Sequence, residues 1–236
     1  MVVDETNEPD ARTITVEVWS DVVCPWCYIG KRRFADGVQQ VTEQLAAEGI
    51  GLAVDVSYHA YQLDPTASPG VSGPVVDAYA KKFGGPERAQ AILASVTATA
   101  AEVGLEFHMD RALRANTLLA HRIIWLAGQP DSPADQDVVK ERLLRAYFTD
   151  GLDIGDPDVL ADCAAEVGFD RDEVAAYLDS DRGAAEVAAD LQFAHENGIT
   201  AVPTYVVNGR WAIPGAQDPE TFAQVLRKMA LSSNGS

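Results

Sequence analysis

The order of secondary structure between residues 13 and 56 is the feature that most constrains the fold. A first segment alternates polar side chains with the apolar Ile14, Val16 and Val18, as a half-buried strand does. A helical pattern follows from about Cys24 to Ala47, and a second alternation occupies 52–56. A strand–helix–strand unit of this length predicts two parallel strands joined by a right-handed crossover.

The rest of the chain divides into a helical block and a second region of strands. A loop rich in Pro and Gly at 65–74 precedes helical patterns that continue to about residue 197. Two strands, Thr204 to Val207 and Arg210 to Ile213, then flank the tight-turn pair Asn208-Gly209. A last helix is expected to begin at Asp218-Pro219 and to reach about Met229.

Neither region of strands can bury its faces alone, so the two are expected to join in one sheet. The predicted fold class is therefore α/β, with the order βαβ, then ββα, and a large all-helical insertion between them. The expected sheet domain is discontinuous and comprises residues 13–65 plus 198–230. Residues 66–197 form the insertion and a connecting helix, residues 1–12 a disordered acidic leader, and residues 231–236 a frayed tail.

The charge of the chain excludes some classes of partner. The formal net charge is −18, from 18 Lys and Arg against 36 Asp and Glu, and such a surface repels phosphate backbones and anionic lipids. We therefore expect no nucleic-acid and no membrane partner. The first ten residues lack the basic end and apolar run of a secretory signal, and no segment approaches the ~18 consecutive apolar residues of a membrane helix. The sequence thus predicts a cytoplasmic protein.

Two cysteines, Cys24 and Cys27, lie at the predicted start of the first helix, directly after the first strand. At the N-cap, free backbone N–H groups and the helix dipole favour the thiolate of Cys24. Pro25 suits the first helical position, where no N–H is needed. Cys27 lies one turn further in and is expected to be less exposed. Cys24 would attack a disulfide and Cys27 would resolve the mixed disulfide.

Half of a zinc site is the alternative interpretation of this pair. Structural zinc usually takes four ligands, and the chain adds only Cys163 and four scattered histidines. The place of the pair within a strand–helix–strand unit favours redox chemistry, so no metal is expected, although a zinc or scaffold role stays open. Cys163 lies in an Ala-rich helical pattern and is expected to be a buried, inert thiol.

The segment Val202-Pro203-Thr204 joins the helical block to the second region of strands. A trans bond is the commoner state before proline, since cis accounts for only ~5% of such bonds. A cis Val202–Pro203 bond would instead expose the Val202 backbone beside the thiols. An extended substrate segment could then pair with that backbone by strand addition.

Several segments, in this order, resemble the DsbA-like oxidoreductases, specifically the FrnE-like branch. The first is Ser20 to Gly30 around the two cysteines, and further segments are Ala60 to Pro65, Ala115 to Arg122, Tyr147-Phe148 with Gly151 to Ile154, Val202 to Thr204 with Val207 to Gly209, and Gly215 to Gln217. The resemblance spans roughly residues 13–230, and the ordered set is much more specific than two spaced cysteines alone.

The resemblance implies a thioredoxin-like fold, a nucleophilic Cys24, a resolving Cys27 and a cis Pro203. The branch is related to 2-hydroxychromene-2-carboxylate isomerase, but those isomerases and the kappa-class glutathione transferases lack the cysteine pair. Its presence here favours disulfide exchange or isomerisation, with no required cofactor. Trp26 stands where secreted DsbA proteins carry His, and a neutral ring adds no charge stabilisation to the thiolate, which argues against a very strong oxidant.

An alternative function is a glutathione-dependent isomerase or transferase acting on a small aromatic or polyketide-derived substrate. Partners would then be glutathione and a small molecule rather than protein or peptide thiols and disulfides. A homodimer formed through the helical block is also open. The candidate substrate-binding residues are Pro25, Trp26, Val202, Thr204, Asn116 and His121, the last two from a predicted helix facing the cysteines.

Overall fold

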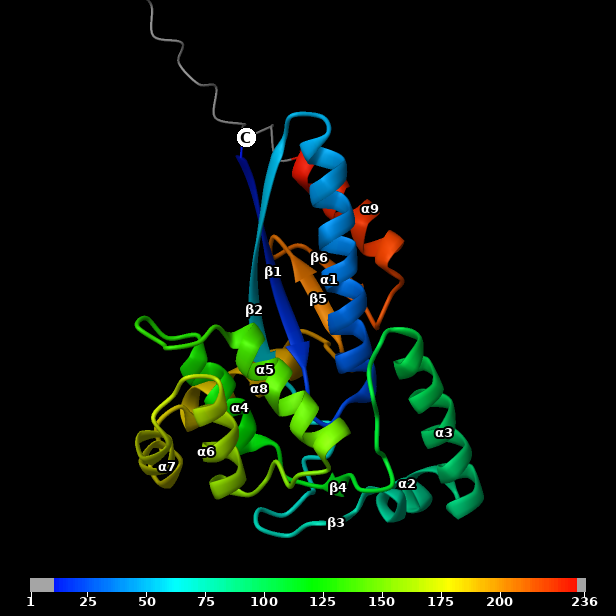
Figure 1. Cartoon of the computed structure of the whole chain (residues 1–236), viewed down its shortest axis with the longest axis vertical. Coiled ribbons are helices and arrows are strands. Elements are labelled where there is room, and N and C mark those ends of the chain that lie inside the picture. Colours follow the sequence, from blue (N-terminus) through cyan, green and yellow to red (C-terminus); the bar gives the residue numbers. More distant parts are fainter. Residues whose placement is uncertain (1–10, 233–236) are drawn as a thin grey trace, which may run out of the picture.

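The computed structural model describes residues 11–232, and a four-stranded sheet forms its centre (Figure 1). The strands are β1 (Ala11–Ser20), β2 (Gly51–Ala60), β5 (Thr204–Val207) and β6 (Trp211–Pro214), in the order β2-β1-β5-β6. β1 and β2 are parallel, while β5 is antiparallel to both β1 and β6. The predicted single mixed sheet is confirmed, and Ile14 and Val16 are completely buried.

Two helices, α1 (Pro25–Ala46) and α9 (Pro219–Ser232), pack against each other beside the sheet (Figure 1). Their close approach depends on Gly37, because a Cβ there would lie 2.7 Å from the Cβ of Phe222. Between these helices and β5, the rings of Phe34, Tyr205 and Phe222 pack with centroids 4.8–5.3 Å apart. Aromatic pairs at such distances anchor the core of this half of the molecule.

The insertion between β2 and β5 gathers around the lower end of the sheet in Figure 1. Its helices are α2 (Val75–Phe83), α3 (Pro86–Glu102), α4 (Leu118–Ala127), α5 (Gln136–Arg145), the π-helical turn η1 (Ala146–Asp150), α6 (Pro157–Glu166), α7 (Arg171–Asp179) and α8 (Ala184–Glu196). Two of them begin with a side-chain N-cap, because Asp156 accepts hydrogen bonds at the start of α6 and Asp170 does so at the start of α7.

Three expectations about the segments need correction. The insertion is not all-helical, because β3 (Gly73–Pro74) and β4 (Leu113–Arg114) form a small antiparallel ladder. The predicted leader 1–12 is too long, because β1 already begins at Ala11, where that residue pairs with Gly51; residues 1–10 lie outside the described part. Likewise α9 continues to Ser232, into the predicted tail 231–236, of which residues 233–236 are not described.

Ion pairs and hydrogen bonds join α1 to α5 and thus tie the insertion to the sheet domain. Lys31 lies 2.9 Å from Asp137 and 3.0 Å from Glu141, and Arg32 also contacts Glu141. The hydroxyl of Tyr28 donates to Glu141 at 2.7 Å, and that of Tyr58 donates to Asp137 at 2.6 Å. These contacts fix α5 beside the start of α1, which carries the two cysteines.

Candidate active site

Cys24 is the N-cap residue of α1, as the sequence predicts, with extended backbone angles (φ −88°, ψ 112°). Its Sγ accepts a hydrogen bond from the backbone N–H of Cys27 at 3.3 Å. Pro25 occupies the first turn of the helix and is buried. A helix N-terminus with an N–H directed at sulfur favours a negative charge there. The geometry therefore suits Cys24 for the part of nucleophile.

Cys27 lies one turn inside α1, and both cysteines are free thiols. Cys24 and Cys27 are each 3% exposed, so the expectation that Cys24 would be the more exposed of the two is wrong. Burial raises the pKa of Cys27 well above its usual range, and the neighbouring Cys24 raises it further. The charge of Lys140 and a backbone hydrogen bond from Asp21 act in the opposite direction on that pKa.

The loop before β5 lies against the thiols. The Val202–Pro203 peptide bond is cis, as the resemblance implies. Cys24 Sγ lies 3.6 Å from the carbonyl oxygen of Val202, to which the thiol can donate. The Pro203 carbonyl in turn accepts from the backbone N–H of Gly215 at 2.7 Å. The structure thus places the partly buried Val202 directly beside the nucleophile.

Gly30 allows this loop to approach α1. A Cβ at this position would lie 2.8 Å from the Tyr205 hydroxyl, 3.0 Å from Pro203 Cγ and 3.2 Å from Ala216 Cβ. Arg33, one turn along the same helix, donates to the Ala216 carbonyl at 2.9 Å. The first turns of α1 therefore hold both the cysteines and the loop that faces them.

The remaining candidates near the cysteines differ in exposure. Trp26, between the two cysteines, is 45% exposed and presents an apolar surface beside them. Thr204 is buried, and its hydroxyl donates to the Ala201 carbonyl at 2.8 Å. The Thr204 hydroxyl thus stabilises the loop, whereas the exposed Trp26 ring remains available for contact with a substrate.

His121 is buried at 3% exposure, so the structure places it in the interior rather than on a surface facing substrate. Its Nε2 lies 3.1 Å from the Tyr61 carbonyl and 3.3 Å from Asp21 Oδ1. Because a carbonyl only accepts, Nε2 carries the hydrogen. Asp21 is completely buried, and its other oxygen accepts from the backbone N–H of Leu63 at 2.8 Å. His121 and Asp21 therefore fix the loop that leads into Cys24.

Asn116 is also engaged within the protein and precedes α4 rather than lying on it. Its side-chain amide donates to the Ala67 carbonyl at 2.7 Å, and its oxygen accepts from Leu118 N–H at 3.0 Å. Arg122, on the same segment, is buried and donates to four carbonyls, those of Tyr177, Leu178, Ser180 and Arg182. Asn116 and Arg122 therefore hold the insertion together. The helical periodicity of the sequence alone could not distinguish this structural role from a role in substrate binding.

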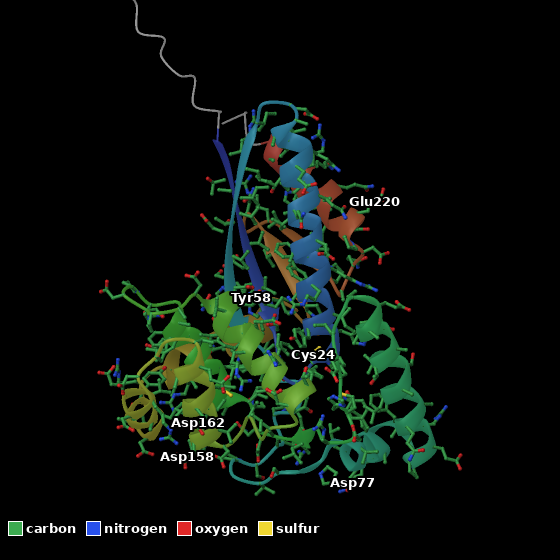
Figure 2. The ribbon with its side chains drawn as sticks, viewed as in Figure 1. Cys24, Tyr58, Asp77, Asp158, Asp162 and Glu220 are labelled. Atoms are coloured by element: carbon green, nitrogen blue, oxygen red, sulfur yellow. The ribbon has the colours of Figure 1, made fainter. Side chains whose placement is uncertain are left out.

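A cavity of about 810 Å³ opens beside the cysteines. Val23, the residue before Cys24, forms part of its wall, together with Tyr79, Tyr147, Lys81, Lys82 and Arg114 from the insertion. Burial raises the pKa of Tyr79 to about 12, and the charge of Cys24 contributes to this rise. The cavity is thus electrostatically coupled to the nucleophile. In Figure 2, Cys24 lies at the lower end of α1, and Asp77 marks the helix α2 below it.

The third cysteine lies apart from this site, on α6. Cys163 is 1% exposed, and burial raises its pKa to about 11, although Arg142 lowers it in part. A buried thiol that resists ionisation is a poor nucleophile. In residues 11–232, no group of three or more His, Cys, Asp or Glu side chains could hold a metal ion.

A family model described as a DSBA-like thioredoxin domain matches residues 15–227, which is nearly the whole of the described chain. The chain belongs to the DsbA-like thioredoxin family. The match includes the sheet, both cysteines, the cis-proline loop and the helical insertion, so the thioredoxin-like fold class inferred from the sequence is confirmed.

Individual relatives support the place of this chain in the DsbA-like family. The structure of a probable DsbA oxidoreductase from Streptomyces coelicolor has 30% identity and a TM-score of 0.83, covering 94% of this chain and 92% of its own. The uncharacterized protein YwbO of Bacillus subtilis is 28% identical and covers 91% of this chain and 96% of its own length.

Two more distant structures share the fold alone. The cytosolic disulfide reductase DsbM of Pseudomonas aeruginosa, solved with glutathione, has 18% identity and a TM-score of 0.61, covering 91% and 98% of the two chains. A 2-hydroxychromene-2-carboxylate isomerase has 13% identity and a TM-score of 0.64, covering 94% and 100%. The suspected relation to 2-hydroxychromene-2-carboxylate isomerase is therefore present at the level of fold.

No helix within residues 11–232 is both long and apolar enough to cross a membrane.

Proposed function

We propose that this protein is a thiol–disulfide oxidoreductase in which Cys24 is the nucleophile and Cys27 the resolving cysteine. The observation that carries the proposal is the position of Cys24 Sγ, which caps α1, accepts the N–H of Cys27 and faces the Val202 carbonyl. Family membership supports the same chemistry. Cys24 and Cys27 are both free thiols, so the structure shows the reduced form of the pair.

In the reductive direction, the Cys24 thiolate attacks one sulfur of a substrate disulfide. A new Cys24–substrate disulfide forms, the substrate S–S bond breaks, and the released thiolate takes up a proton. The Cys27 thiolate then attacks Cys24 Sγ, and the second substrate sulfur leaves as a thiolate and is protonated. The protein loses two electrons to the substrate, and the reverse sequence oxidises a substrate dithiol.

Protein or peptide disulfides are the proposed substrates. The partly buried Val202 backbone lies beside Cys24, and the exposed ring of Trp26, between the two cysteines in the sequence, adds apolar surface. An extended segment could pair with the Val202 backbone while its disulfide reaches Sγ, as in strand addition. Pro25, Pro203 and Thr204 would act indirectly, by holding these two surfaces in place.

Serine variants of the three cysteines test the proposal in insulin reduction. Cys24→Ser is expected to abolish turnover, and Cys27→Ser is expected to accumulate a mixed disulfide on Cys24 that mass spectrometry detects. Cys163→Ser is the matched control and should retain full turnover, because this thiol is buried on α6. Full activity of Cys24→Ser would refute the proposal.

A glutathione-dependent isomerase or transferase is the second candidate, and the cavity beside Cys24 favours it. A volume of about 810 Å³ suits a small molecule, and the cationic side chains of Lys81 and Lys82 suit the carboxylates of glutathione. Arg114, in the same wall, is already paired with Asp64 at 2.7 Å. The neighbour solved with glutathione supports this option at the level of fold. Calorimetry with Cys27→Ser tests it: saturable glutathione binding is expected, and no binding heat would exclude it.

We also propose that the exchange takes place in the cytoplasm. The fold shared with a cytosolic disulfide reductase supports this location. Cell fractionation with an antibody to the full-length protein tests it, and recovery outside the cytoplasmic fraction would contradict it.

A further inference from the structure

Lys140, on α5, is a buried cation that the chemistry described so far does not use. Its side chain is 1% exposed and ranks among the largest fully buried side chains of the protein. Among residues 11–232, its Nζ has no hydrogen-bond partner. The Nζ lies over the face of the Tyr58 ring, 5.6 Å from its centroid. The hydroxyl of Tyr58 is already committed to Asp137.

A buried ammonium without hydrogen bonds is expensive, because burial removes its hydration. Burial accordingly lowers the pKa of Lys140. Replacement of such a group by an apolar side chain of similar length is often neutral or stabilising. Packing alone therefore gives no reason for a lysine at this position.

The groups that act on Lys140 are those of the active site. Negative charge on Cys27, Asp21 and Cys24 favours its ammonium form, and the positive charge of Lys31 opposes it. In the other direction, the Lys140 charge lowers the pKa of Cys27, whose burial raises it. The two helices meet at this point, because Glu141, the residue after Lys140 on α5, accepts a hydrogen bond at 2.7 Å from the hydroxyl of Tyr28, the residue after Cys27 on α1. Asp137 and Glu141 are themselves already paired with Lys31 and Arg32 on α1.

We propose that Lys140 is the charge partner of Cys27 and makes its thiolate accessible for the resolving step. This inference rests on the proposed disulfide exchange and assigns a positioning role that acts through Cys27. Neutral amine with thiol and ammonium with thiolate hold the same number of protons. The buried pair can therefore form the nucleophile without releasing a proton to solvent.

The step balances as follows. The Cys27 thiolate attacks Cys24 Sγ in the mixed disulfide, the Cys24–Cys27 bond forms, and the bond from Cys24 to the substrate sulfur breaks. Cys27 is then neutral, so the ammonium of Lys140 no longer faces a thiolate there. The proton held on Lys140 is released, and the departing substrate thiolate takes up one proton.

The test uses the full chain carrying Cys163→Ala and one equivalent of 5,5′-dithiobis(2-nitrobenzoate). Attack by Cys24 releases the first thionitrobenzoate, and attack by Cys27 on the mixed disulfide releases the second. Each release is followed by absorbance from pH 6 to 11. In Lys140→Met, we expect the second release to slow by about tenfold or more at pH 7 and its pH midpoint to rise, since each unit in thiol pKa changes the thiolate fraction tenfold. The first release should change much less.

Three further variants distinguish the loss of the Lys140 charge from a general disturbance of the fold. Lys140→Arg keeps the positive charge and should retain the pH midpoint of the chain with Lys140, whereas Lys140→Gln should behave like Lys140→Met. Lys228→Met removes a lysine on α9, which lies near Trp211, and should leave both releases unchanged. If Lys140→Met does not fold, Lys140→Gln carries the test.

An unchanged pH midpoint in folded Lys140→Met or Lys140→Gln would overturn the inference. Failure of the proposed function itself has a different signature. In that case the second thionitrobenzoate is not released even by the chain that retains Lys140. That chain then behaves like Cys27→Ser, which has no resolving thiol. The two failures are therefore distinguishable in one experiment.

Discussion

Gly30→Ala tests whether the close approach of α1 to the cis-proline loop builds the site. The new Cβ would lie 2.8 Å from the Tyr205 hydroxyl and 3.0 Å from Pro203 Cγ, and Cβ atoms essentially never approach a neighbour closer than 3.0 Å. Tyr205 cannot move aside easily, because it is 2% exposed and its ring packs against Phe34 and Phe222. The loop is therefore expected to shift away from the helix.

The magnitude follows from two opposing effects. An extra methyl group forced into a packed interior costs about 1–3 kcal/mol. Alanine in place of glycine within a helix regains about 0.5–1 kcal/mol. With both effects near the middle of their ranges, the expected net loss is about 1 kcal/mol in the free energy of unfolding, measured by urea denaturation. Insulin reduction by the folded variant should also slow, because the Val202 carbonyl moves from its place 3.6 Å from Cys24 Sγ.

Gly37→Ala is the matched control on the same helix. Its Cβ would lie 2.7 Å from Phe222 Cβ and 2.8 Å from the Pro219 carbonyl oxygen, away from the cysteines. We expect a similar loss of stability but unchanged insulin reduction per folded molecule. The reasoning is refuted if Gly30→Ala is at least as stable as wild type and reduces insulin at the wild-type rate. In that case only the gain from alanine in the helix would be observed.

Three other predictions concern single side chains. Arg122→Met removes the guanidinium that donates to four carbonyls and should lower the free energy of unfolding by about 3 kcal/mol or more in urea denaturation; a loss below about 1 kcal/mol would contradict its structural role. Asn116→Ala should cost about 1–2 kcal/mol through the lost bonds at the start of α4, with glutathione binding unchanged by calorimetry; selective loss of binding would restore Asn116 as a substrate contact. Because the pKa of Cys27 is raised on folding, its protonated thiol stabilises the fold fully below the unfolded pKa of about 8.5, and this contribution is lost as pH rises above it. The stability of wild type relative to Cys27→Ala should therefore decrease between about pH 8 and 10, and a constant difference would contradict the raised pKa.

Patterns within short segments predicted much of the fold. The alternation at Ile14, Val16 and Val18 gave a strand whose apolar side chains are indeed buried, because a period of two has one physical solution in a half-buried sheet. The pair Asp218-Pro219 marked the start of α9 correctly. The start of α2 has no such mark, because the helix begins directly after a Pro-rich loop and its N-cap residue Pro74 supplies no side-chain hydrogen bond.

The cysteine site was predictable in part. The position of Cys24 at the N-cap follows from local pattern, and the cis bond before Pro203 came from the resemblance rather than from local statistics. The polar residues around the cysteines depend on contacts distant in sequence. His121 and Asp21 are 100 residues apart, and nothing in either segment indicates that they meet.

The sequence spacing around Lys140 indicated that this side chain would be buried. It lies four residues before Leu144 and seven before Tyr147, and both of these are buried. That spacing places all three on one face of a helix. A lysine on a buried face needs a compensating charge, so the spacing alone raises the question of a partner. Only the folded chain answers it, because the partner, Cys27, comes from a helix in the other half of the molecule.

The insertion thus sets the surroundings in which the thiols react. The sheet domain supplies both sulfurs and the Val202 carbonyl, while the insertion supplies His121 behind the loop, Lys140 beside Cys27 and most of the wall of the cavity. Exchange of a side chain in the insertion can therefore alter the two thiols to different degrees. Because the resolving step depends on Cys27 and the first attack on Cys24, the insertion gives the protein a means to change one rate more than the other.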